Sequence, residues 1–471
     1  MTIDYLKCRT QDLEIPDENP FQNDKLGRSQ IADVLTDVAS FYGQSGCVMA
    51  LDGEWGAGKT TFVKMWEKSL QKKGFKTLYF NAWSSDYSDD ALMAIVSELQ
   101  GLSPDSSKSQ ELVEVTGRIL FTVGKIATKY FIGSDVDAIE ALLPKNIGKE
   151  CLNTYVTQKN TIKDFKNQVS EFVAFNAGEH PIVFFVDELD RCSPRYAVSV
   201  LERIKHLFEI PNIIFVLAIN KVQLCNAIQG YFGSDQIDSN EYLRRFIDIN
   251  YTLEIPDVKT YCKHLYNQYG FDDFFNTQER LNYFRNDSES DNFIDTAIQM
   301  CNFSKSNLRQ IDRIFSYARL ALMQFKANTY ILPNIYFMLC FWKIMNPSFY
   351  SKIRNVIYTP QELLTELENI LPKDFFTNEP SNYNAIHNIY TIAAFIFGYD
   401  KTSHPNEQTI HRPTLTSTDS QGNLIFNVKS NVFEKEDFER ALYFYFNHYR
   451  ENIDNGFTYL FQRIDLLKSF N

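Results

Sequence analysis

The feature that most constrains how this chain can fold is a glycine-rich stretch between two patterned segments. It consists of Gly53, Glu54, Trp55, Gly56, Ala57, Gly58, Lys59 and Thr60. This is the pattern GxxxxGK[ST], whose glycines let the backbone wrap around phosphate oxygens while the next helix directs N–H groups at the anion. This motif requires a strand before it and a helix after it. Residues 47–51 have the pattern of a strand and residues 60–71 that of a helix. We therefore predict a phosphate-binding loop in preference to a chance glycine-rich turn.

The positions of this loop have distinct expected roles in holding a nucleoside triphosphate. The backbone of residues 53–59 surrounds the phosphates, and Lys59 reaches the β and γ phosphates. The hydroxyl of Thr60 is a ligand of Mg²⁺, and Thr61 is expected to contact the α-phosphate. ATP and Mg²⁺ are thus the expected ligands.

Two adjacent carboxylates follow the most apolar run of the chain. Residues 182–186 predict a strand buried on both faces, and Asp187 and Glu188 come directly after it. We expect Asp187 to hold the Mg²⁺ shell through water and Glu188 to act as general base on the attacking water. The alternative is an ordinary strand that ends in solvated acids. Asp190 either braces the loop, pairs with Arg191 or takes part in catalysis, and the sequence leaves these open.

Polar residues after or before other predicted strands supply further candidates. Asn220 follows the run 213–219 and is a candidate sensor of the γ-phosphate, or else a helix cap. Arg244 and Arg245 precede a weaker run at 249–253. One of them, with Arg245 as our choice, is a candidate arginine finger that acts across a subunit interface; the alternative is a solvated basic pair.

Two further arginines, Arg309 and Arg313, lie one turn apart on a predicted helix. They either approach the nucleotide from a helical lid or remain on the surface.

Five apolar runs alternate with helical patterns, which predicts an α/β fold with a mostly parallel sheet flanked by helices. The runs are residues 47–51, 75–80, 182–186, 213–219 and 249–253. The predicted domains are a core at 1–255 with a helical insertion at about 104–155, a helical lid at 256–350, and a mostly helical extension at 351–471. A small hairpin is expected near residues 423–428.

Composition narrows the class of protein. The net charge is −12 and no lysine-rich run is present, so nucleic-acid binding is possible but not indicated. The eight cysteines include no CxxC pair, and the first residues lack a signal-peptide pattern, so we expect a cytoplasmic protein with reduced thiols. The apolar runs at 119–132, 335–342 and 386–399 are too short or too polar to span a membrane, and they predict buried helices.

Taken together, these motifs resemble the KAP family of P-loop NTPases, which includes the bacterial phage-exclusion protein PifA. The resemblance covers about residues 15–350. It is carried by residues 19–21 and 26–28, the phosphate loop at 53–61, Phe80-Asn81-Ala82-Trp83, the acidic run 187–192, residues 242–245, and Asn307-Leu308-Arg309 with Arg313.

The resemblance implies an ASCE-type sheet, in which another strand separates the acidic strand from the phosphate-loop strand. It also implies ATP hydrolysis and a molecular switch in anti-phage defence, acting as a homo-oligomer with a separate effector or sensor protein. Three positions depart from the family pattern. Glu188 stands where Asp is usual, Asn220 where Asp is frequent, and Arg245 where Lys is usual.

Two other functions remain open, a nucleotide-gated scaffold that does not hydrolyse and a DNA-remodelling ATPase. The acidic net charge argues against the second. Asn220-Lys221 is followed by Val222-Gln223, so the NKxD motif that selects guanine is absent. This absence favours ATP over GTP.

Overall fold

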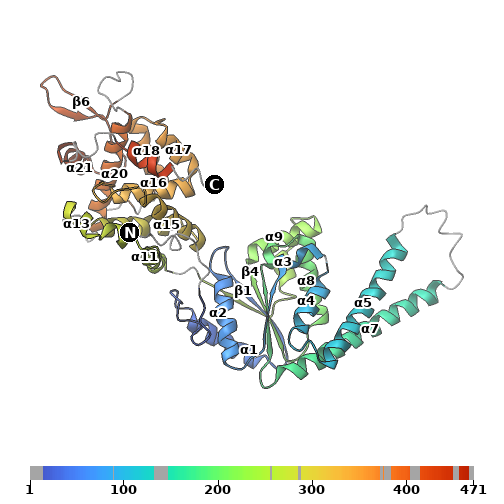
Figure 1. Cartoon of the computed structure of the whole chain (residues 1–471). Coiled ribbons are helices and arrows are strands. Elements are labelled where there is room, and N and C mark those ends of the chain that lie inside the picture. Colours follow the sequence, from blue (N-terminus) through green and yellow to red (C-terminus); the bar gives the residue numbers. More distant parts are fainter. Residues whose placement is uncertain are drawn as a thin grey trace, which may run out of the picture. The chain divides into compact units, whose positions relative to one another are not determined.

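The computed structural model describes two compact units, Leu13–Ile255 and a second one that contains Pro256–Asn471 (Figure 1). The described residues are 14–88, 90–131, 147–254, 257–284, 288–371, 375, 383–403, 414–448 and 456–465. Of residues 120–131, 147–158, 383–385 and 448, the backbone alone is described.

The first unit is built on a five-stranded parallel sheet. The strands are β1 (Cys47–Asp52), β2 (Thr77–Asn81), β3 (Ile182–Asp187), β4 (Ile213–Ile219) and β5 (Ile249–Thr252), in the order β2-β3-β4-β1-β5. All neighbouring strands pair in parallel. The predicted fold class is therefore confirmed, and β4 separates β1 from β3 as the resemblance implied.

The pairing register brings the ends of four strands to one edge of the sheet. Asp52 pairs with Ile219, Asp187 with Ala218, and Asn81 with Asp187. Because parallel strands all end at the same edge, the segments that follow them lie side by side there. This edge carries the phosphate loop and the acidic run.

Helices cover both faces of the sheet (Figure 1). Helices α1 (Ser29–Phe41) and α2 (Lys59–Lys72) pack on one face, where Trp66 lies against Phe185 with ring centroids 5.2 Å apart. Phe184 of the same strand points to the other face, because side chains alternate along a strand. That face is covered by α4 (Ala91–Gln100), α8 (Pro194–Leu207) and α9 (Lys221–Phe232). Burial on both faces explains why β3 and β4 are continuous apolar runs.

The long connection between β2 and β3 contains two long helices, α5 (Ser107–Phe131) and α7 (Ile147–Ala177), which pack against each other. Leu112, Val115 and Val169 are buried in this pairing and against the sheet unit. The sequence analysis placed the insertion at about 104–155, but α7 continues to Ala177 because its buried face extends to the start of β3. The described part of the first unit also has the short elements α3 (Ala82–Ser85), η2 (Asp86–Ser88), η3 (Leu189–Arg191) and α10 (Ser239–Leu243).

The second unit is mostly helical and has one hydrophobic core. Its helices are α11 (Val258–Gln268), α12 (Asp272–Phe275), α13 (Gln278–Tyr283), α14 (Glu289–Phe303), α15 (Leu308–Leu322), α16 (Pro333–Met345), α17 (Pro347–Arg354), α18 (Pro360–Ile370), α20 (Tyr383–Ser403), α21 (Lys435–His448) and α22 (Thr458–Asp465). The hairpin expected near residues 423–428 is present as β6 (Thr416–Thr418) and β7 (Leu424–Phe426). The division into a lid and an extension at residue 350 stays a prediction, and the core includes described residues from both sides of it.

The apolar runs at 335–342 and 386–399 belong to packed helices. Helix α16 is buried almost all round, and α20 buries Ile392, Phe395 and Ile396. The run at 119–132 lies mostly among residues whose side chains are not described. In the portion of the chain that the structure covers, no helix combines the length and apolar character that crossing a bilayer requires.

A buried ion pair ties α13 to α14 in the second unit. Arg280 donates from Nε and Nη2 to the two carboxylate oxygens of Glu289, each at 2.6 Å, and both side chains are buried. The rings of Phe274 and Phe284 lie 4.5 and 4.8 Å from the guanidinium carbon. Arg280 also donates to two backbone carbonyls of the segment before α16, at 3.1 and 2.9 Å.

We predict that Arg280→Met destabilises the second unit by about 3–5 kcal/mol, because Glu289 is left as a buried charge without its cation. The matched control is Arg440→Met, which removes an exposed ion pair with Asp437 and should cost less than about 1 kcal/mol. Urea unfolding of the full chain, followed by circular dichroism, measures both. Equal losses of unfolding free energy in the two variants would show that the buried ion pair stabilises the protein no more than the exposed one.

Candidate functional site

The phosphate loop connects β1 to α2 and has the backbone conformation that its glycines permit. Gly56 and Gly58 have φ values of 83° and 81°, in the left-handed region that residues with a Cβ seldom adopt. Gly58 is the N-cap of α2, so the first N–H groups of this helix face the loop. Trp55 and Glu54 lie on the exposed side of the loop, and Ala57 is buried.

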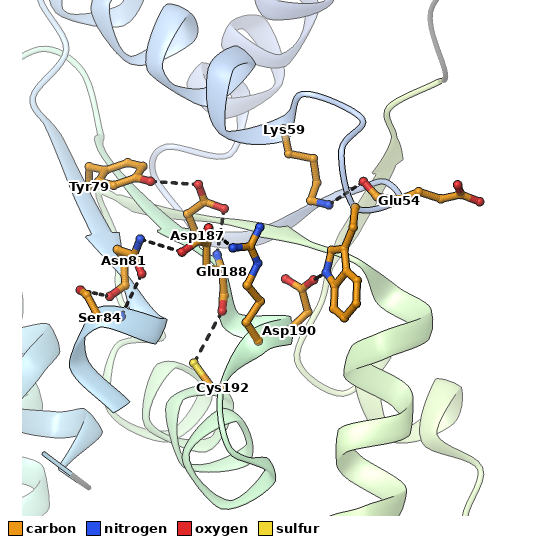
Figure 2. Close-up of polar contacts among 11 residues, drawn as sticks. Glu54, Lys59, Tyr79, Asn81, Ser84, Asp187, Glu188, Asp190 and Cys192 are labelled. Carbon is orange, nitrogen blue, oxygen red and sulfur yellow. Dashed lines mark hydrogen bonds and ion pairs between the residues drawn. The ribbon is translucent and has the colours of Figure 1, made fainter. Parts of the chain in front are cut away.

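Lys59 curls back into its own loop (Figure 2). Its Nζ donates to the carbonyl oxygens of Gly53 at 2.5 Å and Glu54 at 3.1 Å. Burial lowers the pKa of Lys59, and the nearby carboxylates of Asp190, Asp187 and Asp52 oppose that shift. An amine that already sits among the loop carbonyls beside acidic side chains can move to phosphate oxygens with little rearrangement.

Asp187 ends β3 and is almost fully buried. It accepts hydrogen bonds from Tyr79 Oη at 2.9 Å and from the backbone N–H of Glu188 at 2.8 Å. Burial raises the pKa of Asp187, and these hydrogen bonds partly offset the shift. The hydroxyl of Thr60 also lowers that pKa, so the first turn of α2 lies near the acidic strand end.

Glu188 is the next residue, and both of its carboxylate oxygens have partners. Asn81 Nδ2 donates to Oε2 at 2.9 Å, and Arg191 Nη1 lies 2.8 Å from Oε1. Glu188 has φ 60°, one of a few residues with a Cβ in the left-handed region. This conformation costs of the order of 1 kcal/mol of folding free energy, and it persists where the surrounding contacts hold it in place.

Asp190 braces the loop. Its Oδ2 accepts a hydrogen bond from the indole Nε1 of Trp55, which lies in the phosphate loop. This hydrogen bond connects the two motifs, and it agrees with the structural alternative that the sequence left open. The other alternative, pairing of Asp190 with Arg191, is not what the structure has, because Arg191 pairs with Glu188.

Asn220 follows β4 at the same edge of the sheet. It is the N-cap of α9, and its Oδ1 accepts from the backbone N–H of Gln223 at 3.2 Å. Capping is the alternative that the sequence analysis named. Capping uses the amide oxygen of Asn220. The amide nitrogen, which a γ-phosphate sensor would use as donor, takes no part in the cap, so the sensor role stays a prediction.

Arg245 lies away from the loop of its own chain. It precedes β5, whose Ile249 pairs with Met49, so it sits at the edge where the strands begin. The loop follows β1 at the opposite edge of the sheet. Both arginines are exposed, and Arg244 pairs with Glu241 at 2.8 Å.

Arg309 and Arg313 are exposed on α15 in the second unit, and their predicted approach to nucleotide stays a prediction. Thr61 is exposed on the first turn of α2.

The sequence analysis missed four side chains that the fold brings to the site. Tyr79 and Asn81 come from β2, where the register sets Asn81 opposite Asp187. Arg191 contacts Glu188, and Arg28 donates from Nη1 to the carbonyl of Gly58 at 3.5 Å and from Nη2 to that of Glu254 at 3.2 Å. Three of the four belong to the motif stretches of the family resemblance, but the sequence assigned none of them to Glu188 or to the loop, and Arg191 was considered only as a partner of Asp190.

The donor set of this edge fits Mg²⁺ held jointly by protein, phosphate and water. Mg²⁺ prefers oxygen ligands and is usually bound by one or two protein groups plus phosphates. Thr60 and Asp187, which lie near enough for the hydroxyl to lower the pKa of the carboxylate, supply a hydroxyl and a carboxylate. Among the described residues, no group of three or more His, Cys, Asp or Glu side chains is placed to hold a metal by itself.

Comparison with known proteins agrees with this geometry. The model of the KAP family P-loop domain matches residues 27–320, more than half of the chain. The chain therefore belongs to the KAP family of P-loop NTPases. No curated protein sequence matches it.

Several solved structures are distantly similar. The ORC2 protein of Aeropyrum pernix in its ADPNP–ADP complexes is 13% identical over 94% of this chain and 95% of its own, with a TM-score of 0.36. Cdc6p from Pyrobaculum aerophilum is 11% identical over 96% and 90%, with a TM-score of 0.35. Drosophila ORC bound to DNA is 12% identical over 96% and 97%, also at 0.35. At these scores the similarity carries no inference about function.

We predict that Thr60→Ala removes the contribution of Mg²⁺ to ATP binding. Wild type should bind ATP at least about tenfold more tightly with Mg²⁺ than with EDTA, and Thr60→Ala should bind equally in both because one metal ligand is lost. Isothermal titration calorimetry gives the affinities. If Thr60→Ala weakened binding by the same factor with and without Mg²⁺, the hydroxyl would serve the loop and not the metal.

Proposed function

We propose that this chain is a Mg²⁺-dependent ATPase that works as a molecular switch. One observation carries the proposal: the loop at residues 53–60 and the carboxylates of Asp187 and Glu188 meet at one edge of the sheet, where the Trp55–Asp190 hydrogen bond joins the loop to the acidic run. A general base, a lysine for the phosphates and a site for a metal are thus within reach of one ligand. Such a set supports phosphoryl transfer to water.

The residues divide the work of hydrolysis. The loop N–H groups and Lys59 bind the phosphates and stabilise the charge that develops in the transition state. Glu188 takes a proton from the attacking water, whose oxygen bonds to the γ-phosphorus while the bond from that phosphorus to the β–γ bridging oxygen breaks. The products are ADP and inorganic phosphate. Mg²⁺, held by Thr60 and Asp187, supplies charge neutralisation on the phosphate oxygens.

The finer features of the proposal rest on sequence. ATP is preferred over GTP because the NKxD motif is absent after β4. The resemblance to PifA-like members of the family supports a role in bacterial anti-phage defence, with a separate effector or sensor protein as partner.

The test is ATP turnover by the purified full chain, beside Lys59→Ala and Glu188→Gln. We predict that Lys59→Ala loses nucleotide binding, because it removes the cation of the phosphate site. Glu188→Gln should bind ATP normally and lose at least about 100-fold in turnover, as expected for a general base. If wild type bound no nucleotide, or if both variants hydrolysed ATP as wild type does, the proposal would fall.

The position of Arg245 supports a homo-oligomer in which neighbouring subunits share each nucleotide site. An exposed arginine at the far edge of the sheet cannot reach its own loop, but it can serve the loop of a neighbouring copy.

We predict that Arg245→Ala lowers turnover, whereas the neighbouring Arg244→Ala, which breaks only an exposed ion pair, does not. Mixing Arg245→Ala with Lys59→Ala should restore activity. In a mixed oligomer, the intact loop of an Arg245→Ala subunit can meet the intact Arg245 of a Lys59→Ala subunit. Full activity of Arg245→Ala alone, or mixtures that stay inactive, would exclude an arginine supplied by a neighbour.

A nucleotide-gated scaffold without turnover is the second candidate. It is favoured by the two partners on Glu188, which occupy both oxygens of the expected base. Tight ATP binding by wild type with turnover no faster than that of Glu188→Gln would support the scaffold.

A further inference from the structure

We propose that Arg191 is a triphosphate-sensing positioning residue: it leaves Glu188 for the terminal phosphate when a nucleoside triphosphate binds, and so releases the base for catalysis. The proposal rests on the proposed ATPase function. It concerns a residue for which neither the loop pattern nor the acidic strand end supplies a role.

The starting state is a base that cannot act. Glu188 Oε1 is 2.8 Å from the Arg191 guanidinium, and Oε2 accepts from Asn81 at 2.9 Å. The oxygen that Arg191 holds is directed at the guanidinium and not at an attacking water. Hydrolysis therefore requires the ion pair to open while Glu188 stays in position. Asn81, on the other oxygen, can keep it there.

The geometry lets Arg191 reach a second anion. Arg191 ends the short η3 turn that begins directly after Glu188, and its side chain is partly exposed (28%). Burial lowers the pKa of Lys59 and the charge of Arg191 adds to that lowering, so the two cations lie in one region of the site. Lys59 is the residue expected on the β and γ phosphates. A γ-phosphate there lies in the field of both cations.

A terminal phosphate competes well with Glu188 for this guanidinium. It carries more negative charge than one carboxylate, and guanidinium groups bind phosphate oxygens in bidentate fashion. The Arg191 Cζ lies 5.7 Å from the centroid of the half-exposed Trp83 ring, a face on which a guanidinium remains favourable as it moves. ADP has no γ-phosphate, so with ADP bound the Arg191–Glu188 pair stays closed.

The test compares Arg191→Gln with Arg195→Gln, both in the full chain. Arg195 is an exposed arginine four residues further along, in α8. Three outcomes are expected. We expect wild type to bind ATPγS at least about tenfold more tightly than ADP, and Arg191→Gln to reduce that ratio to within about threefold, the loss of one charge-assisted phosphate contact. ADP affinity should not change. Turnover should fall by about 100-fold or more, since an arginine on the transferring phosphate contributes at least that much. Arg195→Gln should match wild type throughout.

Titration calorimetry with Mg²⁺ and phosphate release measure these quantities, and thermal unfolding checks that each variant is folded. Arg191→Lys keeps the charge and serves if the glutamine variant does not fold; it should retain part of the ATPγS preference. An unchanged ATPγS-to-ADP ratio in folded Arg191→Gln or Arg191→Lys would overturn the phosphate contact. Faster turnover in either would mean that Arg191 only restrains Glu188, which also overturns the proposal.

These results separate the inference from the function on which it rests. If wild type binds and hydrolyses ATP and Arg191→Gln behaves identically, the inference alone fails. If wild type binds no nucleotide, the ATPase proposal fails and the inference fails with it.

Discussion

The parallel pairing of β1, β4 and β3 is the constraint on which the site depends. Three chain segments more than thirty residues apart each end a strand at one edge of the sheet, and their registers match Asp52 to Ile219 and Asp187 to Ala218. A shift of one residue in β3 would turn Asp187 to the other face of the sheet. Because β3 and β4 are buried on both faces, packing fixes that register, and the hydrophobic core thereby positions the carboxylates.

The polar contacts at that edge form a connected set. Trp55 of the loop bonds to Asp190, Tyr79 bonds to Asp187, and the pair Asn81 and Arg191 holds Glu188. The loop, β2 and the acidic run are therefore coupled before any ligand binds. A ligand that moves Lys59 changes bonds within the loop, and one that moves Arg191 frees an oxygen of Glu188, which also bonds to Asn81 of β2. Linked contacts of this kind are what a nucleotide-dependent switch needs.

Much of this could be predicted from sequence, for a physical reason. Strands β3 and β4 are fully buried, so their apolar runs gave their bounds to within one residue, and the GxxxxGK[ST] pattern located the loop because its chemistry is local. The partners of Glu188 could not be predicted, since Asn81 comes from a strand about a hundred residues earlier and only the register of β2 against β3 brings them together. The end of the insertion was missed for the same reason: the buried face of α7, which extends to Ala177, depends on what packs against it.

The central claim is that one nucleotide engages both the loop and the acidic strand end, and amide hydrogen exchange tests it most directly. The full chain would be compared with and without MgATPγS. The account predicts increased protection in residues 53–61, whose N–H groups bind phosphate, together with changed exchange in residues 187–192, where the Glu188 and Arg191 contacts rearrange. Protection of the loop with no change at 187–192, or no change at either, would contradict it.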